Sequence, residues 1–404
     1  MKRTAKTILS ISLLSILMSL TSCFSPIFYE VRKDVKPEKA TVSGNIPNIT
    51  RYRTADKEFL FLAADGGLRY KRADNEEHGS WSEYSVPFEL TSFNFDDTAM
   101  NGQQIISVLA NHDTLYVVSV DIATTGADGM SVPSTVHLWG KKISGTNGSV
   151  SGAGNWVHIN AKLSSLLQIY YNREDGSVES GFNVFQTNAP MASHRHAYIC
   201  SFDSTEKKFK YYELNGTDAP VEFTIEKAED ATAAANTDDG RVYSAAYYNG
   251  AVKFFHTETV STDETYSKEA KTLYYTNGND LWSMTGNSKV KIISADSKIS
   301  TITTCADSII LGKGDIKAGA GGGGVSRLKI TNGVLEHSFS DFSTNASFQL
   351  TDGYLVIAMI NATPDKKEED SALYASITYF NKNGVFDNIG LWSYYPGRGN
   401  WNRE

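Results

Sequence analysis

Few residues in this sequence combine the type and the spacing that chemistry requires. His194 and His196 lie two positions apart, so on a strand they would share one face and offer two imidazoles to a zinc ion. Zinc needs a third and a fourth ligand, and the spacing of the other histidines, cysteines and acids marks none nearby. We therefore interpret His194-Arg195-His196 as a surface loop before a strand. We expect no metal and no cofactor.

The glycine run from Gly319 to Gly324 is the second candidate, because glycine-rich loops can cradle phosphate. A phosphate loop has Lys-Ser or Lys-Thr directly after its last glycine, followed by a helix that directs its N–H groups at the ligand. Here Val325-Ser326-Arg327 follows, and the next residues are typical of a strand. The pattern predicts a loop between two strands and no nucleotide site.

Acidic residues are numerous, but they do not form a recognisable catalytic or calcium-binding motif. None of their clusters repeats the ligand spacing of a calcium loop. No Gly-x-Ser-x-Gly, His-Glu-x-x-His or Arg-Ile-Pro motif occurs. The two carboxylates of a glycosidase can lie far apart in a sequence, so glycan chemistry stays open. The acidic clusters are Asp96-Asp97, Glu229-Asp230, Asp238-Asp239 and Glu368-Glu369-Asp370.

The cysteines differ in their surroundings. Cys200 and Cys305 each lie in an apolar, strand-like run, where a free thiol behaves as a small hydrophobic group. We expect two free core thiols, with a disulfide between them as the alternative. Cys23 instead follows Thr7–Leu20, a 14-residue apolar stretch preceded by Lys2, Arg3 and Lys6. That stretch is too short to span a bilayer and has the form of a signal peptide.

The residues Leu20-Thr21-Ser22-Cys23 resemble the lipobox of a bacterial lipoprotein precursor, and all four positions match. The resemblance implies that residues 1–22 are removed and that the Cys23 thiol receives a diacylglyceryl group. Two or three acyl chains anchor a protein stably, at about 0.8 kcal/mol per buried CH₂. The protein would then be held on a membrane of the bacterial cell envelope. An ordinary secreted protein with Cys23 as a chance neighbour is the alternative.

Two further parts follow Cys23. Residues 23–48 contain three of the nine prolines and no sustained apolar period, so we expect a lipidated, flexible tether. Residues 49–404 contain many short runs rich in β-branched and aromatic residues, often separated by Asp-Gly or Asn-Gly, which suit hairpin turns. This pattern predicts an all-β domain. The clearest runs are Phe59–Ala64, Thr114–Val120, Ala197–Phe202, Lys208–Leu214, Val242–Tyr248, Val252–His256, Lys271–Tyr275, Ile309–Gly312, Tyr354–Ile360 and Leu373–Phe380.

All six tryptophans fall into two short motifs, which indicates an internal structural repeat. In two places a Leu-Trp precedes a Gly-x-Trp, and a third copy, from Gly67 to Trp81, has Tyr70 for the first tryptophan. We interpret each copy as the outer hairpin of one repeating sheet. The Gly-x-Trp tryptophans are Trp81, Trp156 and Trp401, and the Leu-Trp tryptophans are Trp139, Trp282 and Trp392.

Repeated antiparallel sheets without helices favour a β-propeller, which leaves only short sheet edges exposed. The Gly-x-Trp turns resemble degenerate Asp-boxes of sialidase-like propellers, with an acid, a glycine and a tryptophan kept between Asp74 and Trp81. We expect seven blades, with six as the alternative, because residues 231–294 could hold one blade or two. We expect a strand near Ile49–Arg53 to pair into the final blade. Two stacked β-sandwich domains are the competing architecture.

Composition and charge limit the function. The 404 residues include 38 Lys and Arg against 46 Asp and Glu, a net charge of −8, which argues against nucleic-acid binding. We expect a non-enzymatic binding or scaffold platform for a protein or glycan partner, acting through the insertions Ile122–Pro133, Thr257–Ala270 and Thr363–Ser371. The alternative is a glycan-active hydrolase or lyase with its site in the propeller channel.

Overall fold

The computed structural model has an all-β fold, which confirms the fold class predicted from the sequence. In the part of the chain that it describes, the one helical element is the short 3₁₀ helix η6 (Glu368–Asp370). No helix among these residues is long and apolar enough to cross a membrane. The structure describes residues 40–44, 46, 48–54, 57–64, 67–75, 80–84, 86, 103–123, 132–143, 156–159, 182–186, 197–203, 208–223, 245–247, 272–277, 279–285, 288–314, 323–331, 334–338, 340–341, 353–380, 386–395 and 401–404.

The described strands form six antiparallel sheets, numbered here 1 to 6 in chain order, and each is a meander of consecutive strands. Sheet 1 holds β1 (Ile49–Arg53), β2 (Glu58–Ala64), β3 (Gly67–Arg72) and β4 (Ser82–Tyr84). Sheet 2 holds β5 (Gln103–Ala110), β6 (Thr114–Ala123), β7 (Val132–Lys142) and β8 (Val157–His158). Sheet 3 holds β9 (Phe182–Gln186), β10 (Ala197–Asp203), β11 (Lys208–Glu213) and β12 (Val221–Phe223).

Sheets 4 to 6 follow the same order, with one additional short strand in sheet 5. Sheet 4 holds β13 (Ala245–Tyr247), β14 (Thr272–Asn277), β15 (Asp280–Thr285) and β16 (Ser288–Ser294). Sheet 5 holds β17 (Ile299–Thr304), β18 (Ser308–Lys313), β19 (Gly324–Thr331) and β20 (Val334–Leu335), with β21 (Ser340–Asp341) also paired to β19. Sheet 6 holds β22 (Tyr354–Asn361), β23 (Leu373–Phe380), β24 (Phe386–Tyr394) and β25 (Trp401–Arg403).

Local sequence explains several of these strands and turns. Nine of the ten predicted runs overlap a strand, although only residues 245–247 of Val242–Tyr248 are described, and the tenth, Val252–His256, lies outside the described residues. Strand β2 is buried at six of its seven positions, as its nearly continuous apolar sequence predicts. The pairs Ala64–Gly67 and Thr331–Val334 close hairpins whose two linking residues are an Asp-Gly and an Asn-Gly.

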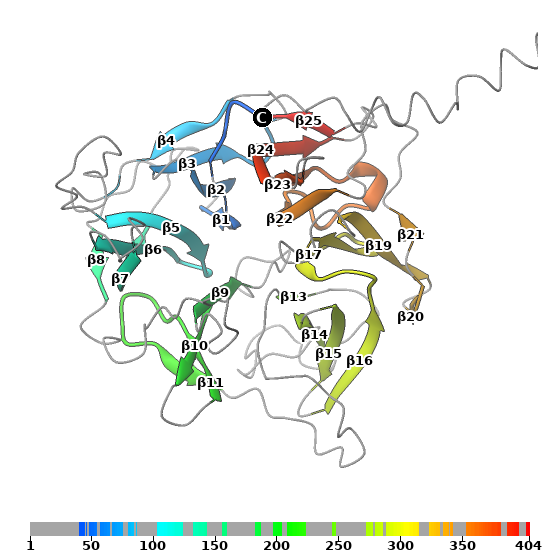
Figure 1. Cartoon of the computed structure of the whole chain (residues 1–404), viewed down its shortest axis with the longest axis horizontal. Coiled ribbons are helices and arrows are strands. Elements are labelled where there is room, and N and C mark those ends of the chain that lie inside the picture. The colour runs from blue at the N-terminus through cyan, green and yellow to red at the C-terminus, as the bar shows by residue number, and fades with distance from the viewer. Residues whose placement is uncertain are drawn as a thin grey trace, which may run out of the picture.

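The six sheets follow one another around a common centre in Figure 1, with the first strand of each nearest to it. Around this centre β1 contacts β5, β5 contacts β9, β9 contacts β13, β13 contacts β17, β17 contacts β22, and β22 contacts β1. The apolar core lies between neighbouring sheets. One cluster joins sheets 6 and 1, a second joins sheets 1 and 2, and a third joins sheets 5 and 6.

The two ends of the described chain meet in sheet 6. The backbone N–H of Ala40 donates to the carbonyl of Ile389 at 2.9 Å, and that of Leu391 donates to the carbonyl of Val42 at 2.9 Å. Between them Gly390 has a φ of +86°, and a Cβ there would lie 2.4 Å from the Val42 carbonyl oxygen. Only glycine allows this close approach.

These contacts revise two predictions. The expected closing strand, Ile49–Arg53, is instead β1 and pairs with β2 within sheet 1. The residues that pair with the last sheet are Ala40 and Val42, which the sequence placed in the flexible tether. Ala40, Val42 and Ile46 are all buried apolar residues, and Val42 and Ile46 pack in the core cluster that joins sheets 6 and 1. Residues 1–39, which include the predicted signal peptide and Cys23, lie outside the described residues.

Candidate functional site

The tryptophan motifs occupy two positions within the sheets. Each Leu-Trp lies in the third strand of a sheet, and the leucine is fully buried in every copy. Each Gly-x-Trp places its tryptophan at or just before the start of a fourth strand. The third-strand residues are Trp139 in β7, Trp282 in β15 and Trp392 in β24, and the others are Trp81 before β4, Trp156 before β8 and Trp401 in β25.

Backbone pairing aligns three copies residue by residue. Glu404 donates its N–H to the carbonyl of Leu391 at 2.9 Å, as Ile159 does to the carbonyl of Leu138 at 2.8 Å. In sheet 1 the matching pair is Tyr84 and Leu68. Tyr84, Ile159 and Glu404 therefore hold equivalent places in their sheets.

The same alignment corrects one detail of the predicted repeat. Counting from the buried leucines, Arg69 occupies the position of Trp139, and Tyr70 occupies the position of Gly140. The sequence had matched Tyr70 to the tryptophan because both residues are aromatic. Lys71 and Lys141 then hold the next equivalent positions, beside Trp81 and Trp156 respectively.

A buried ion pair lies where sheet 6 meets sheet 1, at a contact that we name the 6/1 seam. The ammonium of Lys71 lies 2.9 Å from Oε2 of Glu404, and both side chains have no exposed surface. The Lys71 ammonium also donates to the hydroxyl of Tyr395 at 3.1 Å, and the indole N–H of Trp81 donates to Glu404 Oε2 at 3.0 Å. The hydroxyls of Tyr374 and Tyr395 are hydrogen-bonded to each other.

The aromatic rings of the 6/1 seam enclose the lysine. Its ammonium lies 5.9 Å from the ring centroid of Trp81, 5.3 Å from that of Tyr374 and 5.8 Å from that of Tyr395. Burial, and then the charge of Glu404, raise the pKa of Tyr395 above its ordinary value. Tyr395 therefore remains a neutral donor at physiological pH. A buried charge needs such full pairing, since an isolated one would be strongly unfavourable.

The contact between sheets 1 and 2, the 1/2 seam, has the same geometry with different chemistry. The ammonium of Lys141 lies 5.2 Å from the ring centroid of Tyr84 and 5.7 Å from that of Trp156. Tyr84 and Glu404 hold equivalent positions, and each contacts the lysine of the following sheet, Lys141 and Lys71 respectively. The Lys141 residue is only 6% exposed, and burial lowers its pKa below the ordinary value.

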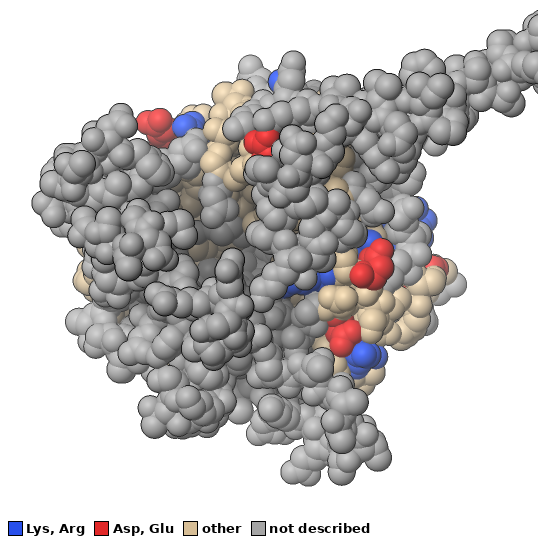
Figure 2. Space-filling view, viewed as in Figure 1, with Lys and Arg blue, Asp and Glu red and all other residues tan. Residues whose placement is uncertain are grey.

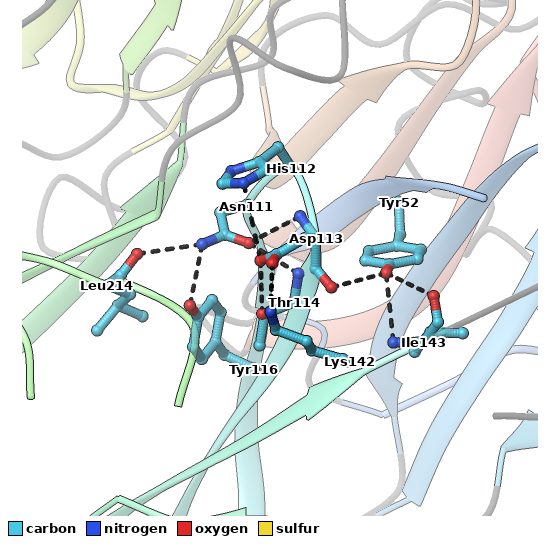
Figure 3. A network of polar contacts seen from close by, with 9 residues as sticks. All are labelled: Tyr52, Asn111, His112, Asp113, Thr114, Tyr116, Lys142, Ile143 and Leu214. Carbon is cyan, nitrogen blue, oxygen red and sulfur yellow. Dashed lines mark hydrogen bonds and ion pairs between the residues drawn. The ribbon is translucent and has the colours of Figure 1, made fainter. Parts of the chain in front are cut away.

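A polar network at the ends of the strands joins sheets 1, 2 and 3 (Figure 3). The hydroxyl of Tyr52, near the end of β1, shares its hydrogen between the carbonyls of Asp113 at 2.9 Å and Ile143 at 2.8 Å, which flank the strands of sheet 2. The side-chain amide of Asn111 donates to the hydroxyl of Tyr116 at 3.0 Å and to the carbonyl of Leu214 beside sheet 3 at 3.1 Å. Burial raises the pKa of Tyr52 to about 12, so this hydroxyl stays protonated.

Asp113, with His112 beside it, is the one group in this network that could be mistaken for a catalytic base. Burial acts to raise the pKa of Asp113, but hydrogen bonds from Lys142 and Thr114 outweigh it and hold that pKa below the ordinary value. Lys142 lies 2.9 Å from one carboxylate oxygen, and the Thr114 hydroxyl donates to the other at 2.7 Å. His112 lies 4.0 Å away. The carboxylate is thus held as an anion between Thr114 and Lys142, while the side chain of Asn111 accepts hydrogen bonds from the N–H groups of the turn.

The insertion Thr363–Ser371 is the one predicted binding loop that falls within the described residues. Its base is fixed by Asn361, whose side-chain amide donates to the Thr304 carbonyl at 2.9 Å and to the Ser371 hydroxyl at 3.1 Å. Its tip is fixed to sheet 5, where Arg327 bonds to Glu368 and the Glu368 N–H donates to Asp307 at 2.9 Å. The remaining charged residues of the loop are exposed: Asp365, Lys366, Lys367, Glu369 and Asp370.

Cys305 lies beneath this loop as a free, buried thiol, as the sequence predicted. Its sulfur accepts a hydrogen bond from Asn361 at 3.2 Å, and the Ser371 hydroxyl bonds to it at 3.2 Å. Burial raises the pKa of the thiol to about 12. It is therefore not a nucleophile at neutral pH. Cys200 lies in β10, and its side chain is outside the described residues.

The other predicted site residues fall outside the described residues. They are Cys23, His194-Arg195-His196, the glycines from 319 to 322, the acidic pairs before residue 240, and the insertions at 124–131 and 257–270. Within the described part of the chain, no three His, Cys, Asp or Glu side chains converge on a metal position. Reasoning from the sequence missed Lys71, Lys141 and Glu404. The signal that could have found the lysines is a Leu-x-x-Lys before each of the first two Gly-x-Trp motifs.

Comparisons with known proteins add little to this picture. No family model matches the chain, and the search of curated proteins finds no match. Among solved structures, a puromycin-hydrolyzing peptidase of Mycobacterium tuberculosis gives a TM-score of 0.37 at 8% identity, covering 85% of this chain and 45% of its own. This chain therefore spans less than half of that peptidase.

Two further solved structures are similarly distant. A chain of the mitotic checkpoint complex gives a TM-score of 0.36 at 10% identity, covering 92% of this chain and 85% of its own. The C-terminal domain of gp131 from bacteriophage phiKZ gives a TM-score of 0.33 at 7% identity, and the match covers 85% of this chain and 78% of that domain's chain. At these scores we infer nothing about the activity of this chain.

Proposed function

We propose that the six sheets are the blades of one β-propeller. The observation that carries this proposal is that the contact between neighbouring sheets is repeated. Glu404 of sheet 6 contacts Lys71 of sheet 1. In the equivalent positions, Tyr84 of sheet 1 contacts Lys141 of sheet 2. The succession of first-strand contacts, which returns from β22 to β1, supports the same arrangement. An experimental structure in which sheets 1 and 6 are apart would contradict it.

We propose further that the propeller is held on a membrane of the bacterial cell envelope through acyl chains on Cys23. The support is the match of Leu20 to Cys23 to the lipobox, after a cationic and an apolar segment. Growth of the producing bacterium with labelled palmitate tests this. We expect label in the natural protein and none in a Cys23→Ala variant. Equal labelling of the two would contradict the anchor.

The function that the geometry supports best is a non-enzymatic platform that binds a protein or glycan partner. The supporting observation is the loop Thr363–Ser371, which exposes five charged residues while Asn361, Arg327 and Asp307 fix its base and tip. A loop fixed in this way loses little conformational entropy when it binds. On the face shown in Figure 2, the described acids and bases occur in small mixed groups, which suits a partner of mixed charge better than a polyanion.

A photo-crosslinking amino acid at Lys367 tests this proposal in the membrane of the producing bacterium. The matched control is the same amino acid at Val290, which is 55% exposed on β16 of sheet 4. We expect a discrete crosslinked product from position 367 and none from position 290. Replacing Lys366 and Lys367 by serine should then remove the partner from material recovered with the full chain. The same products from both positions, or none from position 367, would contradict a binding role for this loop.

A further inference from the structure

Two histidines meet at the outer edge of sheet 2, away from the polar network and the fixed loop. His137 of β7 and His158 of β8 lie diagonally across neighbouring strands, because His158 pairs with Trp139, two residues after His137. The Nδ1 atom of His137 lies 3.1 Å from Nε2 of His158, and this contact is exposed. The adjacent Val157 is 43% exposed, so the strand edge is open to solvent.

The surroundings of the pair restrict its motion. The ring of His158 stacks on the indole of Trp139, with 4.5 Å between ring centroids and 37° between ring planes. The indole in turn donates to the hydroxyl of Ser119 on β6 at 3.2 Å. His158 is therefore held on a rigid element, which a preformed ligand requires.

We propose that His137 and His158 form a surface site for a divalent late transition-metal ion, with Cu²⁺ favoured over Zn²⁺. Two imidazole nitrogens bound to one ion at about 2.0–2.1 Å are about 2.9 Å apart at a right angle and about 3.4 Å apart at the tetrahedral angle. The observed 3.1 Å lies within this range. Imidazole suits both metals, and the order of affinities places copper first.

Binding needs no net loss of a proton from the pair. In the free protein one ring donates its N–H to the other, so one of the two facing nitrogens carries hydrogen. When the metal binds, that hydrogen moves to the other nitrogen of the same ring, and both facing nitrogens become donors to the ion. Water or a ligand from a partner completes the coordination, since the protein supplies two donors.

Isothermal titration of the untagged full chain in detergent with CuCl₂ tests this site. We expect one tight site per chain, and we expect its affinity to fall at least about 10-fold in His137→Ala and in His158→Ala, since changing an outer partner alone costs about 10- to 100-fold. His112→Ala and His337→Ala are the matched controls and should leave the affinity unchanged. His158→Gln provides a second variant of similar size if the alanine variant does not fold.

His194 and His196 are the alternative location for a tight metal site, and substitutions there test the proposal. If the tight site is lost in His194→Ala/His196→Ala but kept in His137→Ala and His158→Ala, the proposal is wrong. Unchanged affinity in every one of these variants would also overturn it. Loss of the tight site in the His137 and His158 variants alone would establish it, and this readout is independent of any partner that the loop Thr363–Ser371 binds.

Discussion

The 6/1 and 1/2 seams place equivalent residues in equivalent positions and solve the same packing problem differently. In both, a third-strand lysine lies beside the tryptophan of its own sheet and against a residue at the end of the fourth strand of the preceding sheet. In the 1/2 seam that residue is Tyr84, and the lysine is surrounded by rings. In the 6/1 seam it is Glu404, and the lysine forms an ion pair with no exposed surface.

The difference follows from what each seam must join. Sheets 1 and 2 are neighbours in the sequence, so their contact forms with little loss of chain entropy. Lys71 and Glu404 are 333 residues apart, and their contact must select one arrangement among many. A buried ion pair adds little net stability but strongly disfavours a misaligned contact, which would leave a charge unpaired. We interpret the pair as a registry device for the junction of sheets 6 and 1.

The largest effect is expected from breaking the ion pair on one side. Lys71→Met leaves the carboxylate of Glu404 buried without its cation, and we expect the free energy of unfolding to fall by about 3–5 kcal/mol. Denaturation in urea followed by circular dichroism measures this change. A loss below about 1 kcal/mol would show that Glu404 is not buried as an anion, and the comparison of the seams would then fail.

The next largest loss of stability is expected from replacing the tryptophan beside each lysine. Trp81→Phe removes an indole N–H that donates to the carboxylate of Glu404 at 3.0 Å. A hydrogen bond to a charged group contributes about 1.5–3 kcal/mol, so we expect a loss of that size. Trp156→Phe is the matched change in the 1/2 seam and should cost about 0.5–1 kcal/mol, since it weakens the contact of the indole with the Lys141 cation. Equal losses in the two variants would argue against different chemistry in the two seams.

A double substitution sharpens the comparison further. Lys71→Met combined with Glu404→Leu replaces both members of the ion pair with apolar side chains. In the 1/2 seam only the position of Glu404 is occupied by an uncharged residue, Tyr84. We expect stability to return to within about 1–2 kcal/mol of the natural protein, because no charge is left unpaired. Refolding yield should remain lower than that of the natural protein if the pair sets the registry. Full recovery of both stability and yield would leave the ion pair without a registry role.

The sequence predicted the strands and hairpins better than their grouping. The first strands β1, β5 and β17 begin at Ile49, Gln103 and Ile299, where an apolar run follows a polar segment. Residues 231–294, which the sequence could divide into one unit or two, contribute their described strands to one sheet, since β13 and β14 pair across a long insertion. A long segment between two strands has the same residue pattern whether it separates two sheets or connects two strands of one sheet. Residue patterns alone therefore could not decide between seven sheets and six.

The residues of the two seams were less predictable from the sequence than the strands, for a physical reason. Lys71 is ten residues before Trp81, but Lys141 is fifteen before Trp156, because the loops between third and fourth strands differ in length. Fixed spacing therefore does not reveal cross-strand partners. Glu404 occupies a position that holds apolar residues in sheets 1 and 2, and its partner lies at the far end of the chain. Only the contact between sheets 6 and 1 brings the two together.

The smallest effect is expected in the 1/2 seam. Lys141→Met should change the free energy of unfolding by less than about 1 kcal/mol near neutral pH, because no buried anion among the described residues is paired with Lys141. Cation–π contacts with Tyr84 and Trp156 are lost, while the cost of burying an ammonium is also removed. The same substitution at Lys71 is the matched comparison, and a loss of about 3 kcal/mol or more at Lys141 would mean that a hidden anion is present.

Alkaline pH provides a check on the same lysine. Burial lowers the pKa of Lys141 in the folded state below the ordinary 10.5, so between these two values the unfolded chain binds more protons than the folded one. The stability of the natural protein should therefore rise relative to Lys141→Met as the pH increases through this window, and the difference should level off above pH 10.5. Urea titrations of both proteins at several pH values measure this difference. A fall instead of a rise would show that the Lys141 ammonium is stabilised in the 1/2 seam, as it would be by a carboxylate.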